Sequence, residues 1–415
     1  MMKVFSIFCF VIVALFGELW SAGSLAAPTY EAPMVILLSM DGVRYDYPDL
    51  REYPAFARMQ RDGVRAPKLI AGWPSSTFPG HVTLATGAWA DHHGIVDNRF
   101  YDRVRKTEYA YGEDANWIDA EPLWIAVERQ GVKAATYFWV GSDTPWHGQR
   151  QSYRIAPFDG AVPESRKVDQ IIAWMDLPAA KRPGLIMSYW HGTDRMGHEK
   201  GPDHPDIAVQ LADQDAQLAR IINAIDTHHA WSRTTLIVVS DHGMTKVTDT
   251  FDLSAFLKAK HIDARVEGGG AVSHIFLTDV RRADELVKAL SGRDAPRQLH
   301  AWRRGLLPPA MHLNHPTRTG DVVVVADAPL ALSDFPWYGR LQYRVMGWCC
   351  GWSAGSHGYD PNTKEMGAIF FALGRGVAKG VRIREVRQID VAPTIAQLLG
   401  VAPPRDSVGA VVALK

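Results

Sequence analysis

The chain has little cysteine and no excess of either charge. It contains 3 cysteines in 415 residues, and its 45 Lys and Arg residues balance 45 Asp and Glu residues. So few cysteines exclude a disulfide-rich scaffold, and a neutral chain lacks the basic face that binding to duplex nucleic acid requires. Cys349 and Cys350 are adjacent, and a bond between neighbouring cysteines closes a strained ring. We interpret this pair as a local structural feature, with free thiols and a vicinal disulfide as open alternatives.

Long hydrophobic runs are also absent. The apolar stretch from Val4 to Phe16 is too short to span a bilayer comfortably. It follows the basic residue Lys3 and precedes a small-x-small motif at Ser24 to Ala26. This order predicts a signal peptide over residues 1–26, with an uncleaved N-terminal anchor as the less favoured alternative. We therefore expect a periplasmic or secreted protein without a stable membrane span, either a monomer or a homodimer.

What the chain does contain is an alternation of apolar strand-like runs and helical patterns. Strands are predicted at residues 34–40, 134–140, 185–190, 235–240 and 368–373, and helices at 54–62, 121–129, 168–175, 205–228 and 390–399. Such an alternation predicts a three-layer α/β/α sandwich with a mostly parallel central sheet. We expect residues 27–415 to form a single catalytic domain.

The pattern changes between about residues 251 and 346. Short strands at 273–277 and 322–326 flank a helix at 282–290, and three consecutive glycines stand at 268–270. We predict that this segment is an inserted lid or small α+β subdomain.

Metal-type side chains follow three of the predicted strands. The carboxyl ends of parallel strands meet at one edge of a sheet, so side chains delivered there converge. Each Asp–His pair taken alone is a weak signal, because such pairs also occur as helix caps and surface ion pairs. Taken together they indicate a two-metal hydrolytic site. Oxygen and imidazole ligands without thiolates favour Zn²⁺, with Mn²⁺ and Fe as alternatives. The residues are Asp41, Asp194 with His198 four positions later, Asp241 with His242, and His357.

Thr77 is the best candidate for a nucleophile. It lies in the segment Ser75 to Pro79 (SSTFP), immediately before a predicted helix whose free N–H groups favour an anion. A plain helix N-cap is the structural alternative, because Thr is common there. Ser75 and Ser76 are rivals on chemical grounds alone.

With these motifs the chain resembles the nucleotide pyrophosphatase/phosphodiesterase family of the alkaline phosphatase superfamily. The matching segments follow the family's order over essentially the whole mature chain. They are Ser39–Arg44 (SMDGVR), Thr77–His81 (TFPGH), Gly87–Asp102 (GAWADHHGIVDNRFYD), Phe138–Asp143 (FWVGSD), Asp194–Pro202 (DRMGHEKGP), Ser240–Met244 (SDHGM) and Ser356–Asp360 (SHGYD).

The resemblance implies an alkaline phosphatase-like fold and two zinc ions. It assigns one zinc to Asp194, His198 and His357, and the other to Asp41, Asp241, His242 and the Thr77 oxygen. It also implies that Asn98 holds a phosphoryl oxygen, and that Phe78, Tyr189 and Phe158 flank the nucleoside or other leaving portion. The chain departs from the family at Gly80, where Asn is usual, and at His191 to Thr193, where acidic residues are common. Both departures concern the choice of substrate.

The expected reaction is hydrolysis of phosphodiester and pyrophosphate bonds in small molecules such as ATP or dinucleotides, through a covalent phospho-threonine. A sulfatase needs a Cys or Ser in a formylglycine-type motif, and the nucleophile loop has no such Cys. A phosphomonoesterase is disfavoured because no Arg closely follows Thr77. A glycerophosphodiester or choline-phospholipid substrate is the alternative within the family. The alternative from another class is a non-catalytic, zinc-stabilised module that binds phosphate-bearing polymers.

Overall fold

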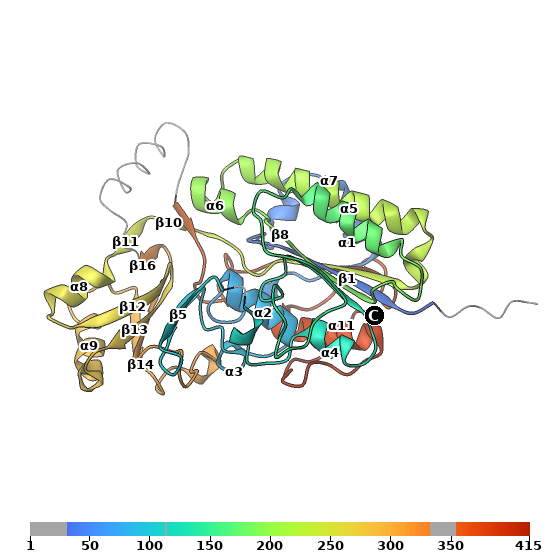
Figure 1. Cartoon of the computed structure of the whole chain (residues 1–415). Helices are drawn as coiled ribbons and strands as arrows, with labels where there is room; N and C mark the ends of the chain where they lie inside the picture. Colours follow the sequence, from blue (N-terminus) through green and yellow to red (C-terminus); the bar gives the residue numbers. More distant parts are fainter. Residues whose placement is uncertain (1–30, 113, 333–353) are drawn as a thin grey trace, which may run out of the picture. The chain divides into compact units, whose positions relative to one another are not determined.

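The computed structural model describes residues 31–112, 114–332 and 354–415 (Figure 1). The predicted signal peptide at 1–26, the Cys349–Cys350 pair and the predicted end of the insertion at 346 lie outside the described residues. In the part of the chain that the structure describes, no helix is both long enough and apolar enough to cross a membrane.

The central sheet has eight strands in the order β19-β2-β18-β9-β1-β8-β6-β7. β1 pairs in parallel with β8 and β9, whereas β18 runs antiparallel to both of its neighbours. The sheet is therefore mixed but mostly parallel. Its strands are β1 (Met34–Met40), β2 (Val64–Arg65), β6 (Ala134–Tyr137), β7 (Tyr153–Ile155), β8 (Leu185–Trp190), β9 (Thr234–Val239), β18 (Phe370–Gly374) and β19 (Val381–Arg382).

Burial on both faces explains the composition of the central strands. Every residue of β1 is buried, and its sequence MVILLSM is nearly all apolar. Successive side chains of a strand point to opposite faces. Val35 and Leu37 accordingly pack into one hydrophobic core, and Ile36 and Leu38 into another. A parallel strand covered on both faces needs such a continuous apolar run.

Helices cover both faces of this sheet (Figure 1). On one face lie α1 (Pro54–Asp62), α5 (Glu164–Met175) and α7 (Asp206–Thr227), whose Phe56, Ile171 and Leu218 join the same core. On the other face lie α2 (Thr77–Thr86), α4 (Leu123–Glu128) and α11 (Val391–Leu399), whose Val82, Trp124 and Ile395 join the second core. The predicted α/β sandwich with a mostly parallel sheet is confirmed.

Several short elements lie at the ends and edges of this framework. The hairpin of β4 and β5, which the sequence patterns did not predict, comes from a segment with few apolar residues. The elements are α3 (Ala90–His93), α6 (Asp194–Lys200), β3 (Leu69–Ile70) paired with β20 (Val386–Arg387), β4 (Arg99–Asp102) paired with β5 (Thr107–Ala110), β10 (Thr245–Val247) paired with β17 (Ala354–Ser356), and β11 (Asp249–Phe251) paired with β16 (Leu330–Leu332).

The segment between β11 and β16 forms a separate antiparallel sheet in the order β12-β13-β15-β14. Ile275, Leu286 and Val324 belong to a third hydrophobic core beneath it. The boundaries of the single domain, 27–415, and of the insertion, about 251–346, remain predictions. The elements of the segment between β11 and β16 are α8 (Leu253–Ala259), β12 (Ala264–Gly269), β13 (Val272–Leu277), α9 (Ala283–Leu290), β14 (Leu299–Arg303) and β15 (Val322–Ala326).

Candidate metal centre and active site

The predicted ligands follow the carboxyl ends of three adjacent strands. β1 lies between β8 and β9, and Ser39 pairs in register with Tyr189 of one and Val239 of the other. Asp41 comes directly after β1, and Asp241 lies two residues beyond β9. Because parallel strands that are in register end together, these carboxylates meet at one edge of the sheet.

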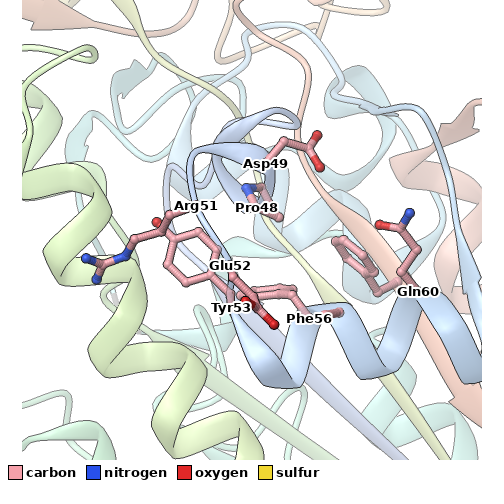
Figure 2. Close-up of a pocket in the computed structure, with 9 residues that line it drawn as sticks. Pro48, Asp49, Arg51, Glu52, Tyr53, Phe56 and Gln60 are labelled. Carbon is pink, nitrogen blue, oxygen red and sulfur yellow. The ribbon is translucent and has the colours of Figure 1, made fainter.

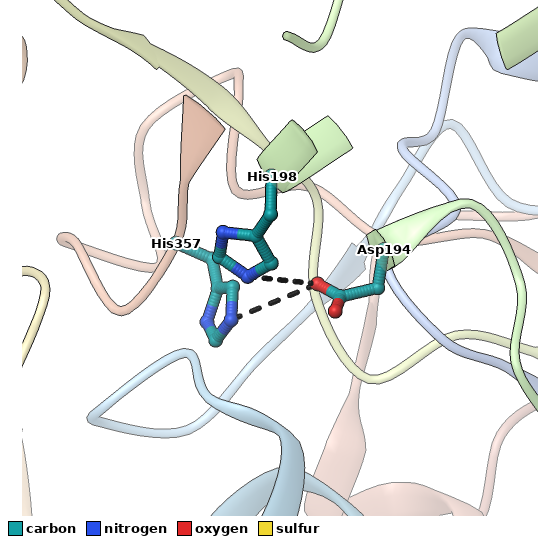
Figure 3. A group of neighbouring side chains, drawn as sticks. All are labelled: Asp194, His198 and His357. Atoms are coloured by element: carbon teal, nitrogen blue, oxygen red, sulfur yellow. Dashed lines mark ion pairs between the residues drawn. The ribbon is translucent and has the colours of Figure 1, made fainter. Parts of the chain in front are cut away.

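Asp194, His198 and His357 form the first group that could hold a metal ion. Both histidines direct Nε2 toward Oδ1 of Asp194, at 3.3 Å from His198 and 3.7 Å from His357 (Figure 3). Asp194 and His198 lie one turn apart on α6, so they share a face of that helix. The other ring nitrogens are occupied: Nδ1 of His198 donates to the carbonyl of Gly355 at 2.9 Å, and Nδ1 of His357 to that of Ser75 at 3.1 Å. With Nδ1 as the donor, each Nε2 offers a lone pair, as a metal ligand must.

Asp41, Asp194 and His242 form a second group. Nε2 of His242 lies 3.5 Å from Oδ1 of Asp41 and 3.2 Å from Oδ2 of Asp241. Nδ1 of His242 donates to the carbonyl of Gly243 at 2.8 Å, which again leaves Nε2 as an acceptor. Asp194 thus belongs to both groups, a connection that the sequence did not predict.

The electrostatics of the cluster call for a cation. Asp41, Asp194 and Asp241 each have a buried carboxylate oxygen with no hydrogen-bond partner among the described residues. Burial, together with the charges of Asp241 and Asp194, raises the pKa of Asp41 well above its usual range. Like charges held together in a buried site cannot all stay ionised without a counter-charge. These residues therefore fit divalent metal ions, and their mix of imidazole and carboxylate donors suits zinc.

The histidines of the first group differ in their electrostatic surroundings. Burial and the neighbouring His242 lower the pKa of His357 well below its usual range, which keeps its ring neutral. Burial alone would lower the pKa of His198, but Asp194 raises it above its ordinary value. The rings of His242 and His357 stack with their centroids 3.7 Å apart. The two groups are thus in direct contact.

Thr77 is the first residue of α2, and its hydroxyl faces the metal-type residues. Its Oγ1 lies 3.3 Å from Nε2 of His242. The N-cap position belongs to Ser76, so the alternative interpretation of Thr77 as a plain N-cap is wrong. Ser75 is buried and donates its hydroxyl to the carbonyl of Tyr359 at 2.7 Å, so this rival is already engaged.

Asn98 is tied to the nucleophile loop. Its Oδ1 accepts the backbone N–H of Phe78 at 2.9 Å, so its side-chain amide group remains a donor. Its own backbone N–H donates to Oδ1 of Asp97 at 2.7 Å. Burial raises the pKa of Asp97 to about 8. Hydrogen bonds therefore fix both the side chain and the backbone of Asn98, which lies one residue before β4.

The three aromatic residues assigned to the substrate lie in two separate neighbourhoods. The Phe78 ring packs edge-on against Tyr111, with the centroids 5.3 Å apart. The Tyr189 ring instead contacts Phe158 at 5.7 Å, and its hydroxyl donates to Oδ2 of Asp41 at 2.6 Å. Phe158 is 41 % exposed. Tyr189 thus orients a metal-type carboxylate, a role that the resemblance did not imply.

The Tyr189 hydroxyl leads to a testable prediction. Tyr189→Phe keeps the ring but removes the hydrogen bond that directs Oδ1 of Asp41 toward His242. Loss of a hydrogen bond to a metal-binding side chain lowers metal affinity or activity about 10- to 100-fold. Metal titration and kcat measure this loss. Tyr153→Phe is the matched control, because that hydroxyl donates to the carbonyl of Lys181 instead. Equal metal affinity in both variants would contradict the role.

Comparison with known proteins identifies the family. The model of the family described as type I phosphodiesterase/nucleotide pyrophosphatase matches residues 35–360, from β1 to just beyond His357. The chain belongs to this family. Both the predicted family and the predicted fold are thereby confirmed.

Relatives of this phosphodiesterase family member are distant but cover most of the chain. An uncharacterized pyrophosphatase/phosphodiesterase of Schizosaccharomyces pombe is 28 % identical over 96 % of this chain and 83 % of its own length. A venom phosphodiesterase of Naja atra is 27 % identical over 92 % of this chain and 46 % of its own length. The chain thus spans about half the length of the venom enzymes that it matches.

Solved structures of the family share the fold. Murine ectonucleotide pyrophosphatase/phosphodiesterase 5, an inactive threonine-to-alanine variant in complex with AMP, is 26 % identical with a TM-score of 0.79. The match covers 89 % of this chain and 96 % of the murine one. The human counterpart matches with the same TM-score of 0.79 and 27 % identity.

Around the buried Lys167, this family member has an ionic cluster that the sequence did not predict. Nζ of Lys167 lies 3.3 Å from Nδ1 of His191, and Nδ1 of His191 lies 3.1 Å from Oε1 of Glu164. Burial lowers the pKa of Lys167 to about 8. Although burial raises the pKa of Glu164, His191 and Lys167 lower it to about 2. The sequence marked only His191, as a departure from the family, because Lys167 lies on a different element.

A surface pocket lies apart from this centre, on α1 and the short 3₁₀ helix η1 (Tyr47–Asp49) (Figure 2). Tyr53 and Phe56 line it together with Asp49, Arg51 and Gln60. It shares no residue with either metal-type group. We therefore assign it no part in the family's chemistry.

Proposed function

We propose that this protein is a zinc-dependent phosphodiesterase and nucleotide pyrophosphatase that acts through Thr77. One observation carries the proposal. The Thr77 hydroxyl, at the N-terminal end of α2, lies 3.3 Å from His242 and beside two groups of residues that need a cation. A helix N-terminus favours an anion, so a phosphoryl group and its attacking oxygen are both accommodated there.

Two Zn²⁺ ions are the proposed cofactors. Asp194, His198 and His357 hold one, and Asp41, Asp241, His242 and the Thr77 oxygen hold the other. The supporting observation is the set of unpartnered carboxylate oxygens among the described residues. When bound, such a pair of ions supplies Lewis-acid stabilisation of the attacking and leaving oxygens.

Thr77 performs the bond exchange in two steps. In the first step its Oγ loses a proton and attacks phosphorus, so that the Oγ–P bond forms. The bond from phosphorus to the leaving oxygen breaks, and that oxygen takes up the proton that Oγ lost and departs as an alcohol, phenol or phosphate. In the second step a water oxygen attacks the same phosphorus and the Oγ–P bond breaks. Thr77 recovers its proton, and the water's other proton is released.

The donors around the phosphoryl group favour a diester over a monoester. Asn98 supplies a neutral amide donor for the charge on an equatorial oxygen, and the backbone bond from Phe78 fixes its orientation. A monoester carries a further negative charge, for which no Arg closely follows Thr77. Nucleotides are the favoured substrates because relatives are named pyrophosphatase/phosphodiesterases and one is held in complex with AMP. We further propose that the protein is exported, from the predicted signal peptide.

The proposal is tested by comparing bis-p-nitrophenyl phosphate with p-nitrophenyl phosphate at equal concentration. We expect the diester to be turned over at least about tenfold faster, which corresponds to a difference of about 1.4 kcal/mol. Release of p-nitrophenolate is the measurement. A preparation of Thr77→Ala purified in parallel corrects for contaminating phosphatases. Faster turnover of the monoester would overturn the assignment.

A further inference from the structure

Gln388 is a fully buried polar residue that the proposed chemistry does not use. It follows β20 directly and has no exposed surface. Both polar atoms of its side chain bind backbone groups of other segments. Oε1 accepts the N–H of Gly72 at 2.8 Å, and Nε2 donates to the carbonyl of Asp241. A buried amide is costly unless its polar atoms are paired, and this one is paired with two segments that are distant in the sequence.

The carbonyl that Gln388 holds belongs to the peptide between two metal-type residues. Asp241 and His242 are consecutive, so the orientation of the peptide that joins them sets the directions of both side chains. Separate bonds hold the side chains themselves. Oδ1 of Asp241 accepts the N–H of Gly42 at 3.1 Å, and Nδ1 of His242 is already engaged. The bond from Gln388 therefore fixes the one part of this pair that the side-chain bonds leave free to turn.

The other bond of Gln388 reaches the segment that leads into the nucleophile. Gly72 lies between β3 and Thr77, which is the first residue of α2. Since β20 pairs in parallel with β3, the residue after β20 lies beside the segment that follows β3. Oγ1 of Thr77 in turn lies 3.3 Å from Nε2 of His242. One side chain thus ties the approach to the nucleophile to the residue that the nucleophile faces.

Gly80, one of the chain's departures from the family, leaves the room that Gln388 occupies. A Cβ atom at this position of α2 would lie 3.1 Å from Nε2 of Gln388 and 3.1 Å from Cβ of Asp241. Contacts this short are rare for real Cβ atoms, so an added side chain would displace one of these neighbours. Glycine is otherwise unfavourable inside a helix. Packing against Gln388 and Asp241 gives the reason for it here.

We propose that Gln388 is a positioning residue for metal binding, whose amide holds the peptide between Asp241 and His242 so that both side chains face one ion. Gly80 admits the Gln388 side chain to this place. The proposal rests on the proposed function, because Asp241 and His242 are its proposed zinc ligands. It places a determinant of metal binding beyond residues 35–360, the part of the chain that the family model matches.

The test measures zinc affinity directly, by competition between the metal-depleted full-length protein and a chelating dye. Gln388→Met keeps the length of the side chain but removes both hydrogen bonds. We expect one of the two zinc ions to bind at least about 10-fold more weakly, because loss of a hydrogen bond that orients a metal-binding residue lowers affinity about 10- to 100-fold. The other ion should keep its affinity, because the carbonyl that Gln388 holds belongs to Asp241.

Gln130→Met is the matched control. The side chain of Gln130 also bridges backbone groups: Oε1 accepts the N–H of Ala402 at 2.7 Å, and Nε2 donates to the carbonyl of the same residue at 2.9 Å. Gln130 belongs to neither metal-type group. The control should lower the Tm of the metal-free protein and leave both zinc affinities unchanged. If Gln388→Met did the same, its role would be structural only and the proposal would be overturned.

Gly80→Ala tests the pairing from the other side and leaves every hydrogen-bonding group in place. It should weaken binding of the same zinc ion in the wild type, because the added carbon presses on Gln388 and Asp241. In a Gln388→Ala background the same change should cost less, since one of its two close neighbours is gone. An equal loss of zinc affinity in both backgrounds would contradict the pairing and overturn the proposal.

The zinc measurements separate this proposal from the proposed function, because they do not depend on turnover. A wild-type protein that binds no zinc would overturn the proposed function and this inference with it. A wild-type protein that binds two zinc ions, with both affinities unchanged in Gln388→Met, would overturn this inference alone.

Discussion

Thr77→Ala is expected to lower kcat for diester hydrolysis by more than about 10³-fold, because it removes the atom that bonds to phosphorus. The Thr77 side chain is small and half-buried at the start of α2, so the fold should tolerate the change. Metal content should stay near that of the wild type, because Asp41, Asp241 and His242, the other three proposed ligands of the second ion, remain in place. Turnover of bis-p-nitrophenyl phosphate and metal analysis of the purified protein measure the two effects.

Two further variants sharpen this test. Thr77→Ser keeps a hydroxyl and should retain measurable turnover, whereas Ser75→Ala removes a buried hydroxyl that already donates to Tyr359. If Ser75→Ala abolished turnover and Thr77→Ala did not, the nucleophile would be assigned to the wrong residue. Isolation of a phosphorylated Thr77 after rapid quenching would support the covalent step directly.

Asp194→Ala is expected to cause the largest loss of bound metal, because Asp194 is the one carboxylate shared by both metal-type groups of the described residues. We expect the ion assigned to Asp194, His198 and His357 to be lost, and the other ion to be held less tightly because Asp194 lies beside its ligands Asp41 and His242. We also expect kcat to fall by more than about 10³-fold because the charge stabilisation is lost. His198→Ala should reduce binding at the first group only, since His198 has no place in the second. Metal per chain is measured by elemental analysis after dialysis.

The control for both variants is Asp213→Ala, which removes an exposed carboxylate from α7. It should retain wild-type metal content and turnover. Circular dichroism should show that all three variants keep their secondary structure, because the β1, β8 and β9 core is apolar and does not depend on the carboxylates. Equal metal loss in Asp194→Ala and His198→Ala would contradict the shared position of Asp194.

The elements that the sequence predicted well are those with a strong local pattern. The strand at 34–40 coincides with β1, and the helix at 54–62 coincides with α1. A fully buried strand needs an uninterrupted apolar run, and an amphipathic helix needs a period of 3.6 residues. The strand predicted at 134–140 ends earlier, at Tyr137, because Phe138 adopts a left-handed φ of 57°. No local pattern signals such a turn when the residue is aromatic.

The candidate site was predictable in composition but not in arrangement. The ligand types and their places after strands could be read along the chain, as could the motifs of the family. The contact between His242 and His357 joins residues that are more than a hundred positions apart, and no periodicity encodes such a contact. The same holds for the bond from Tyr189 to Asp41.

The sequence by itself determined the family, the α/β sandwich and the residue types available for metal binding and attack on phosphorus, because each of these depends on local patterns and motifs. Only the tertiary structure decided that Asp194 serves both metal-type groups, that Tyr189 orients Asp41, and that Tyr111 stands against Phe78. These relations depend on how the carboxyl ends of β1, β8 and β9 and the β4–β5 hairpin are brought together. That convergence follows from burying the apolar strands in one sheet, and it has no counterpart in the linear order of the residues.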